Sequence, residues 1–127
     1  MSSAVGQENE QDRGELEDRM EQIALHTVLK EGKEAEYDRV HARIPDELDP
    51  ALRAAGVHSW RIWRHGLDLF HLLEVEDYQA MRAALREHPA NVAWQARMAE
   101  LLAVEDDYSG VDSGLSLVWE LPADPPA

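Results

Sequence analysis

Hydrophobic and polar residues alternate, or form short apolar runs, in four segments of the chain. In residues 22–29 (QIALHTVL) every second residue, from Ile23 to Leu29, lies on one face, and these residues are mostly apolar. This alternation is typical of a half-buried strand. Residues 57–64 (VHSWRIWR) and 67–75 (LDLFHLLEV) are rich in β-branched and aromatic residues, and the His65-Gly66 pair between them predicts a hairpin. Residues 115–121 (LSLVWEL) predict a last strand.

The segments between these strands show the spacing of amphipathic helices. Residues 33–55 carry apolar side chains three and four positions apart. Pro45 and Pro50 interrupt this pattern, so we expect two helical pieces with a break near residues 43–45 and a stop at Gly56. Further helices are predicted from residue 76 to about 87 and from Pro89 to about 103.

The resulting order, β-α-β-β-α-β, predicts an α+β protein with a ferredoxin-like subunit. A four-stranded sheet of this kind covers one face with its own helices. Because the strands carry apolar residues on both faces, we expect a second copy to cover the other face. The predicted assembly is a homodimer, a dimeric α+β barrel.

Composition divides the 127 residues into three parts. Residues 1–19 hold six acids, two bases and almost nothing that could be buried, so we predict an acidic, disordered segment. Residues 20–121 form the expected domain, and the proline-rich residues 122–127 a short tail. The chain has no cysteine, which excludes disulfides, thiolate zinc sites and a cysteine nucleophile.

The net charge is −14, from 26 acidic and 12 basic residues. This balance argues against nucleic acid and against an anionic membrane surface as partners, because both are bound through clustered Lys and Arg. The sequence shows no apolar run long enough to span a bilayer and no signal-peptide pattern. We therefore expect a cytoplasmic protein that does not bind membranes.

The side chains that can carry chemistry are Tyr37 and His41, four residues apart and hence on one helix face. Histidine exchanges protons near neutrality, and a neighbouring phenol can share a proton or bind a hydroxyl. Taken alone, however, the pair is better explained as two rings that an amphipathic helix buries for packing. His71, on an apolar strand, is interpreted as a core histidine. No phosphate loop, nucleophile elbow or metal-binding histidine pair is present, so we expect no metal.

Four sequence pieces, in order and spacing, resemble the L-rhamnose mutarotase family, and the resemblance covers about residues 21–121. They are Glu36-Tyr37-x-x-x-His41-x-x-Ile44-x-x-Glu47-Leu48, Gly56-x-x-x-Trp60-x-Ile62-Trp63, Leu69-Phe70-x-x-x-Glu74-Val75, and Trp94-x-x-x-Met98.

This resemblance implies a ferredoxin-like subunit in a dimeric barrel that interconverts the α and β anomers of L-rhamnose, a monosaccharide, without a cofactor. By position, it implies Tyr37 and His41 as catalytic residues and Trp60 and Trp94 as substrate-binding residues. Trp60 stands where the family carries tyrosine. The family's paired tryptophans appear as Trp94-Gln95.

Mutarotation opens the sugar ring to an aldehyde and closes it on the other face, which requires proton transfer in both directions. We expect His41 to be the principal acid and base, and Tyr37 to orient it or to bind a sugar hydroxyl. Trp60 and Trp94 would contact the apolar face of the sugar. Two alternatives remain: another cofactor-independent enzyme on this barrel, such as a monooxygenase or cyclase for hydrophobic molecules, or a non-catalytic binding module.

Overall fold

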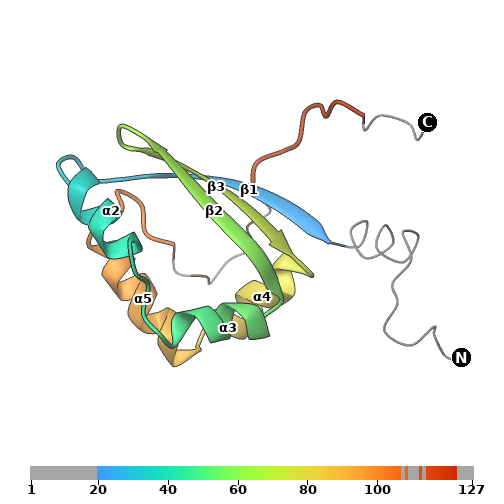
Figure 1. Cartoon of the computed structure of the whole chain (residues 1–127), viewed down its shortest axis with the longest axis horizontal. Helices are drawn as coiled ribbons and strands as arrows, with labels where there is room; N and C mark the ends of the chain where they lie inside the picture. The colour runs from blue at the N-terminus through green and yellow to red at the C-terminus, as the bar shows by residue number, and fades with distance from the viewer. Residues whose placement is uncertain (1–19, 107, 109–111, 113, 123–127) are drawn as a thin grey trace, which may run out of the picture.

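The protein is an α+β domain in which one antiparallel sheet is covered on one side by helices (Figure 1). The computed structural model describes residues 20–106, 108, 112 and 114–122. The acidic segment 1–19 and tail residues 123–127 lie outside the described residues, so their predicted character remains a prediction. The elements are β1 (Glu21–Val28), α2 (Glu34–His41), α3 (Leu48–Ala54), β2 (Val57–His65), β3 (Asp68–Val75), α4 (Tyr78–Leu85) and α5 (Pro89–Ala99).

The described sheet has three strands in the order β1-β3-β2, with β3 in the centre and antiparallel to both neighbours. The inner face carries Leu25, His71 and Ile62 in one row across the three strands. Because side chains alternate along a strand, neighbouring positions such as Phe70 and Trp63 lie on the outer face. Three of the four predicted strands and the hairpin are confirmed, with bounds shifted by no more than one residue.

The predicted strand at residues 115–121 is wrong. Among the described residues, 114–122 form no strand, although the Leu115 N–H donates to the Ala24 carbonyl at 2.7 Å. Beyond this single bond the segment leaves the edge of β1 and runs away from the helices (Figure 1). Leu117, Val118 and Trp119 are each at least 72% exposed. A strand pattern needs a partner strand to become a strand, and within the described residues this segment makes only that one backbone bond to β1.

The expected break in the long helical region is confirmed, because α2 ends at His41 and α3 begins at Leu48, with Pro45 between them. Gly56 follows α3 with φ +99°, a conformation that side chains rarely adopt, so the sequence ends the helix there. The start of α4 is fixed by Asp77, whose carboxylate accepts the Ala80 N–H at 3.0 Å.

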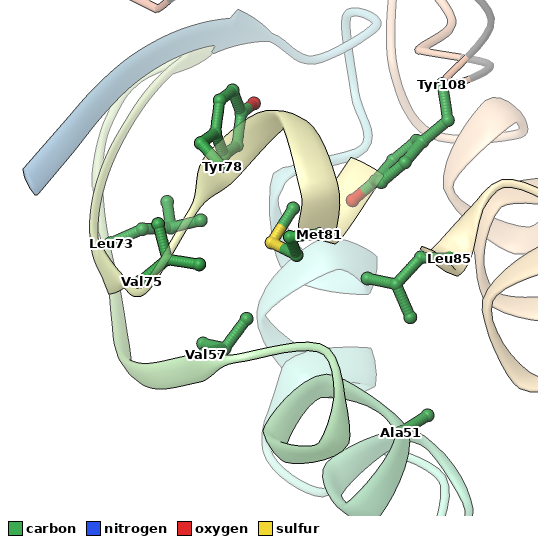
Figure 2. Close-up of a cluster of buried hydrophobic side chains, with 8 residues drawn as sticks. All are labelled: Ala51, Val57, Leu73, Val75, Tyr78, Met81, Leu85 and Tyr108. Carbon is green, nitrogen blue, oxygen red and sulfur yellow. The ribbon is translucent and has the colours of Figure 1, made fainter. Parts of the chain in front are cut away.

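Two hydrophobic clusters hold the helices on the inner face. In the first, side chains from α3, β2, β3 and α4 converge around Met81 (Figure 2). Its buried members are Ala51, Val57, Leu73, Val75, Tyr78, Met81, Leu85 and Tyr108. The second joins Leu29, Tyr37, Leu69, Met98, Leu101 and Leu102. Both strand and helix residues contribute to each cluster, so the two layers are fixed at two places.

In the described part of the chain, no helix combines the length and apolar character that crossing a membrane requires.

Candidate active site

A cavity of about 390 Å³ lies between the inner face of the sheet and the helices. This volume is within the range of small-molecule sites, which are mostly apolar with a few placed polar groups. All four site residues expected from the sequence line it: Tyr37, His41, Trp60 and Trp94. The other polar residues in its wall are Thr27, His71, Tyr78, Asn91, Gln95, Asp106 and Tyr108.

His41 is fixed at the end of α2 by a hydrogen bond to the backbone of its own helix. Its Nδ1 lies 3.0 Å from the carbonyl oxygen of Tyr37. A carbonyl can only accept, so Nδ1 carries the hydrogen and neutral His41 has its lone pair on Nε2. Among the described residues, Nε2 has no hydrogen-bond partner. The ring therefore offers a base to the cavity.

Burial lowers the pKa of His41, and the bond to Tyr37 and the charge of Asp38 only partly offset this effect. The pKa therefore lies below 6.5, the ordinary value for histidine, and His41 is predominantly neutral at neutral pH.

Tyr37 lies against His41 with ring centroids 4.0 Å apart. It is buried, and this burial raises the pKa of its phenol well above the ordinary value of 10. The phenol therefore stays protonated and is suited to donating a hydrogen bond rather than to acting as a base. The contact that orients His41 comes from the Tyr37 carbonyl and ring.

Trp94 on α5 and His41 pack in a T-shaped arrangement, with ring centroids 5.1 Å apart and planes at 75°. Next to it, Gln95 donates to Asn91, and the buried Asn91 amide donates to the Leu85 carbonyl at 3.1 Å. Tyr37, His41 and Trp94 thus form one continuous aromatic wall from α2 to α5. Their spacing in the sequence indicated the first pair, and the resemblance indicated the third member.

His71 was interpreted from the sequence as a core histidine, but it lines the cavity. It lies on β3 and is hydrogen bonded to side chains of both neighbouring strands, Trp60 and Thr27. Burial, together with the charges of His41 and His26, lowers its pKa to about 4. The alternation of the strand placed His71 on the inner face, yet no sequence signal indicated its partners.

At the opposite end of the cavity, a buried arginine contacts the residues that form the wall. Arg82 of α4 is 3% exposed, and its two terminal nitrogens donate to the Asp106 carboxylate at 3.1 and 3.2 Å. Its guanidinium also lies 4.5 Å from the Tyr108 ring centroid, within cation–π range. Because Asp106 and Tyr108 line the cavity, Arg82 positions its wall from behind. No sequence pattern indicated this group, since residues 104–114 show no periodicity.

No group of three or more histidine, acidic or cysteine side chains within the described ranges is arranged to hold a metal ion.

The fold and the cavity define an α+β domain with a small-molecule site, in which one histidine is available for acid–base chemistry. A family model described as L-rhamnose mutarotase matches residues 22–121, so the chain belongs to the L-rhamnose mutarotase family.

Two curated relatives illustrate this membership. The chain is 37% identical over 92 residues to an L-rhamnose mutarotase from Opitutus terrae, covering 71% of this chain and 88% of the relative. It is 36% identical over 104 residues to one from Brucella anthropi, covering 80% and 97%. These matches extend over almost the whole length of the relatives.

A crystal structure of an L-rhamnose mutarotase from Formosa agariphila shares the fold. The TM-score is 0.65 at 24% identity, and the match covers 80% of this chain and 99% of that one. This likeness confirms the α+β architecture and is consistent with the ferredoxin-like arrangement.

Proposed function

We propose that this protein interconverts the α and β anomers of L-rhamnose, with His41 as the acid and base. The observation that carries the proposal is that His41 Nε2, which has no partner among the described residues, borders a cavity large enough for a monosaccharide, within a chain of this family. The lowered pKa of His41 supports the same role, because the neutral ring is the form that accepts a proton.

Ring opening begins when His41 Nε2 accepts the proton of the anomeric hydroxyl. The bond between C1 and the ring oxygen then breaks, and a second group, water or a side chain, supplies a proton to the ring oxygen. The product is the open-chain aldehyde. After rotation about the C1–C2 bond, the ring oxygen attacks the other face of C1, loses its proton to the second group, and His41 returns its proton to O1. Every proton is recovered, so the cycle consumes no co-reactant.

The other three site residues bind and orient the sugar in this proposal. The Tyr37 phenol, kept protonated by burial, donates a hydrogen bond to a sugar oxygen. Trp60 and Trp94 provide apolar surface for ring carbons and for the methyl group of the 6-deoxy sugar.

NMR saturation transfer between the anomeric protons of L-rhamnose tests the activity, because it measures anomer exchange at equilibrium. We expect faster exchange with the protein than without it, and a weaker effect on L-fucose and D-glucose. Thermal unfolding with each sugar separates the alternatives, since a ligand stabilises according to its concentration relative to its Kd. Stabilisation without exchange would indicate a binding module. Neither effect with any sugar would overturn the proposal in favour of another chemistry.

We also propose that the protein is a homodimer in the cytoplasm. The outer face of the sheet exposes Trp63 and Phe70 by 53% and 43%, and the apolar residues after Gly114 are exposed as well. A second copy packed sheet against sheet would bury these surfaces. The chain has no cysteine and therefore needs no oxidising compartment for disulfide formation.

A further inference from the structure

A hydrogen-bonded row of three side chains crosses the inner face of the sheet at the floor of the cavity. Trp60 on β2 donates its indole N–H to Nδ1 of His71 on β3 at 3.1 Å. Nε2 of the same ring lies 2.9 Å from Oγ1 of Thr27 on β1. All three residues line the cavity.

The register of the sheet explains why these side chains meet. His71 faces Leu25 on one neighbouring strand and Ile62 on the other. Thr27, two residues after Leu25, and Trp60, two residues before Ile62, are therefore its diagonal neighbours on the same face. Because β3 lies between β1 and β2 in the described sheet, a side chain on β3 can contact both Thr27 and Trp60.

The direction of each hydrogen bond follows from its partners. An indole nitrogen can only donate, so Nδ1 of His71 must be the acceptor and the ring hydrogen must lie on Nε2, donating to Thr27. Both nitrogens of His71 are thereby occupied. His71 is consequently unsuited to proton transfer, in contrast to His41, whose Nε2 is unpartnered among the described residues.

The bond also changes what Trp60 offers to a ligand. The indole N–H is the single polar group of the tryptophan side chain, and His71 occupies it. Trp60 therefore presents only hydrocarbon to the cavity. A ligand hydroxyl placed there would lose water without gaining a partner, whereas a methyl group would lose nothing.

We propose that His71 is a positioning residue that determines sugar specificity, by holding the Trp60 indole and withholding its N–H from the substrate. This inference rests on the proposed mutarotase function. It predicts that the site distinguishes L-rhamnose from L-mannose, which differs from it by one hydroxyl at C6, and that this discrimination depends on His71.

Two substitutions of similar polarity separate the two hydrogen bonds. In His71→Asn the amide oxygen is separated from Cα by the same number of bonds as Nδ1 of histidine. It can therefore still accept the hydrogen bond from the Trp60 indole. In His71→Gln the amide reaches the position of Nε2, so it can still contact Thr27 but not Trp60. His65→Gln is the matched control, because His65 is an exposed histidine at the end of β2.

The first readout is the indole N–H resonance of Trp60, assigned with Trp60→Phe in a protein labelled at tryptophan nitrogen. We expect it to move upfield in His71→Gln and to stay near its original position in His71→Asn and His65→Gln. The second readout is the ratio of kcat/KM for L-rhamnose to that for L-mannose, from saturation transfer. We expect this ratio to fall about three- to tenfold in His71→Gln, mainly through KM, and to be largely kept in His71→Asn.

An indole resonance that is unchanged in His71→Gln would overturn the assigned bond. A resonance that moves while the ratio of the two sugars stays constant would overturn the role in specificity. If the wild-type protein exchanges the anomers of neither sugar, the proposed function fails instead, and the resonance still tests the contact between His71 and Trp60.

Discussion

The two histidines that line the cavity, His41 and His71, differ in the hydrogen bonds of their ring nitrogens. His41 uses Nδ1 to donate to a carbonyl and keeps Nε2 unpartnered among the described residues, whereas His71 uses both nitrogens for side-chain contacts. Burial lowers the pKa of both rings. Hydrogen-bond direction, more than burial, therefore separates the proposed acid–base residue from the positioning residue.

The pH dependence of anomer exchange tests the assignment of His41. Because the neutral ring is the active base and its pKa lies below 6.5, kcat/KM should be constant from pH 7 to 8 and fall in acid, with a midpoint below pH 6.5. Exchange rates of L-rhamnose measured from pH 5 to 8 give the profile. A rate that increases toward pH 5 would contradict a neutral His41, and circular dichroism at each pH confirms that the protein stays folded.

His71 should make stability depend on pH. Its pKa is about 4 in the folded protein and near 6.5 when unfolded, so the unfolded chain binds the proton first as the pH falls. Neutral His71 therefore contributes to the free energy of unfolding fully above pH 6.5, and this contribution decreases as the pH falls below that value. At pH 5 the loss amounts to at most about 2 kcal/mol.

Urea unfolding at pH 7 and pH 5 measures this effect. His41 contributes in the same direction, so the comparison is between the wild type and His71→Asn. We expect a smaller loss between the two pH values in the variant. Equal losses in both proteins would show that His71 is not held neutral by the fold.

At the scale of elements, local signals predicted most of the fold. Pro45 and Gly56 act on their own backbone, so they fixed the break between α2 and α3 and the end of α3. The last strand could not be predicted correctly from pattern alone, because pairing depends on a partner. The contact between Arg82 and Asp106 could not be predicted either, since it joins a helix to an irregular segment 24 residues away.

Arg82→Met tests how strongly α4 holds this wall of the cavity. The substitution keeps an unbranched apolar stem but leaves Asp106 without its partner, and it should cost on the order of 2–3 kcal/mol in the free energy of unfolding. Because Asp106 and Tyr108 line the cavity, KM for L-rhamnose should also rise severalfold.

Arg53→Met is the matched control, since Arg53 makes an exposed ion pair with Asp49. It should leave both the free energy of unfolding and KM nearly unaltered, because an exposed ion pair contributes little to stability. Similar effects of the two substitutions, measured by urea unfolding and saturation transfer, would contradict a special role of Arg82.

At the scale of the whole molecule, the sheet has unequal faces. Helices cover the inner face and the cavity, while the outer face and residues 115–121 expose large apolar side chains. Sequence patterning predicted apolar residues on both faces of the strands, and a homodimer remains the proposal that buries them. The family resemblance supplied Trp60 and Trp94, which local patterns alone could not place in the same cavity as His41.

Sedimentation velocity tests the homodimer. We expect a dimer at micromolar concentrations for the wild type and a shift toward monomer for Trp63→Glu, which puts a charge on the outer face of the sheet. Arg43→Glu reverses a charge at an exposed position between α2 and α3, away from the sheet, and serves as the control. A wild type that sediments as a monomer would contradict the dimer.

Anomer exchange of L-rhamnose at pH 7.5 in His41→Ala, with His65→Ala as the exposed control, tests whether His41 is the acid and base of the reaction. General acid–base catalysis typically contributes a factor of roughly 10² to 10⁴. We predict a loss of at least about a hundredfold in kcat/KM for His41→Ala and no loss for His65→Ala. Exchange at the wild-type rate in a folded His41→Ala protein would contradict the acid–base role of His41.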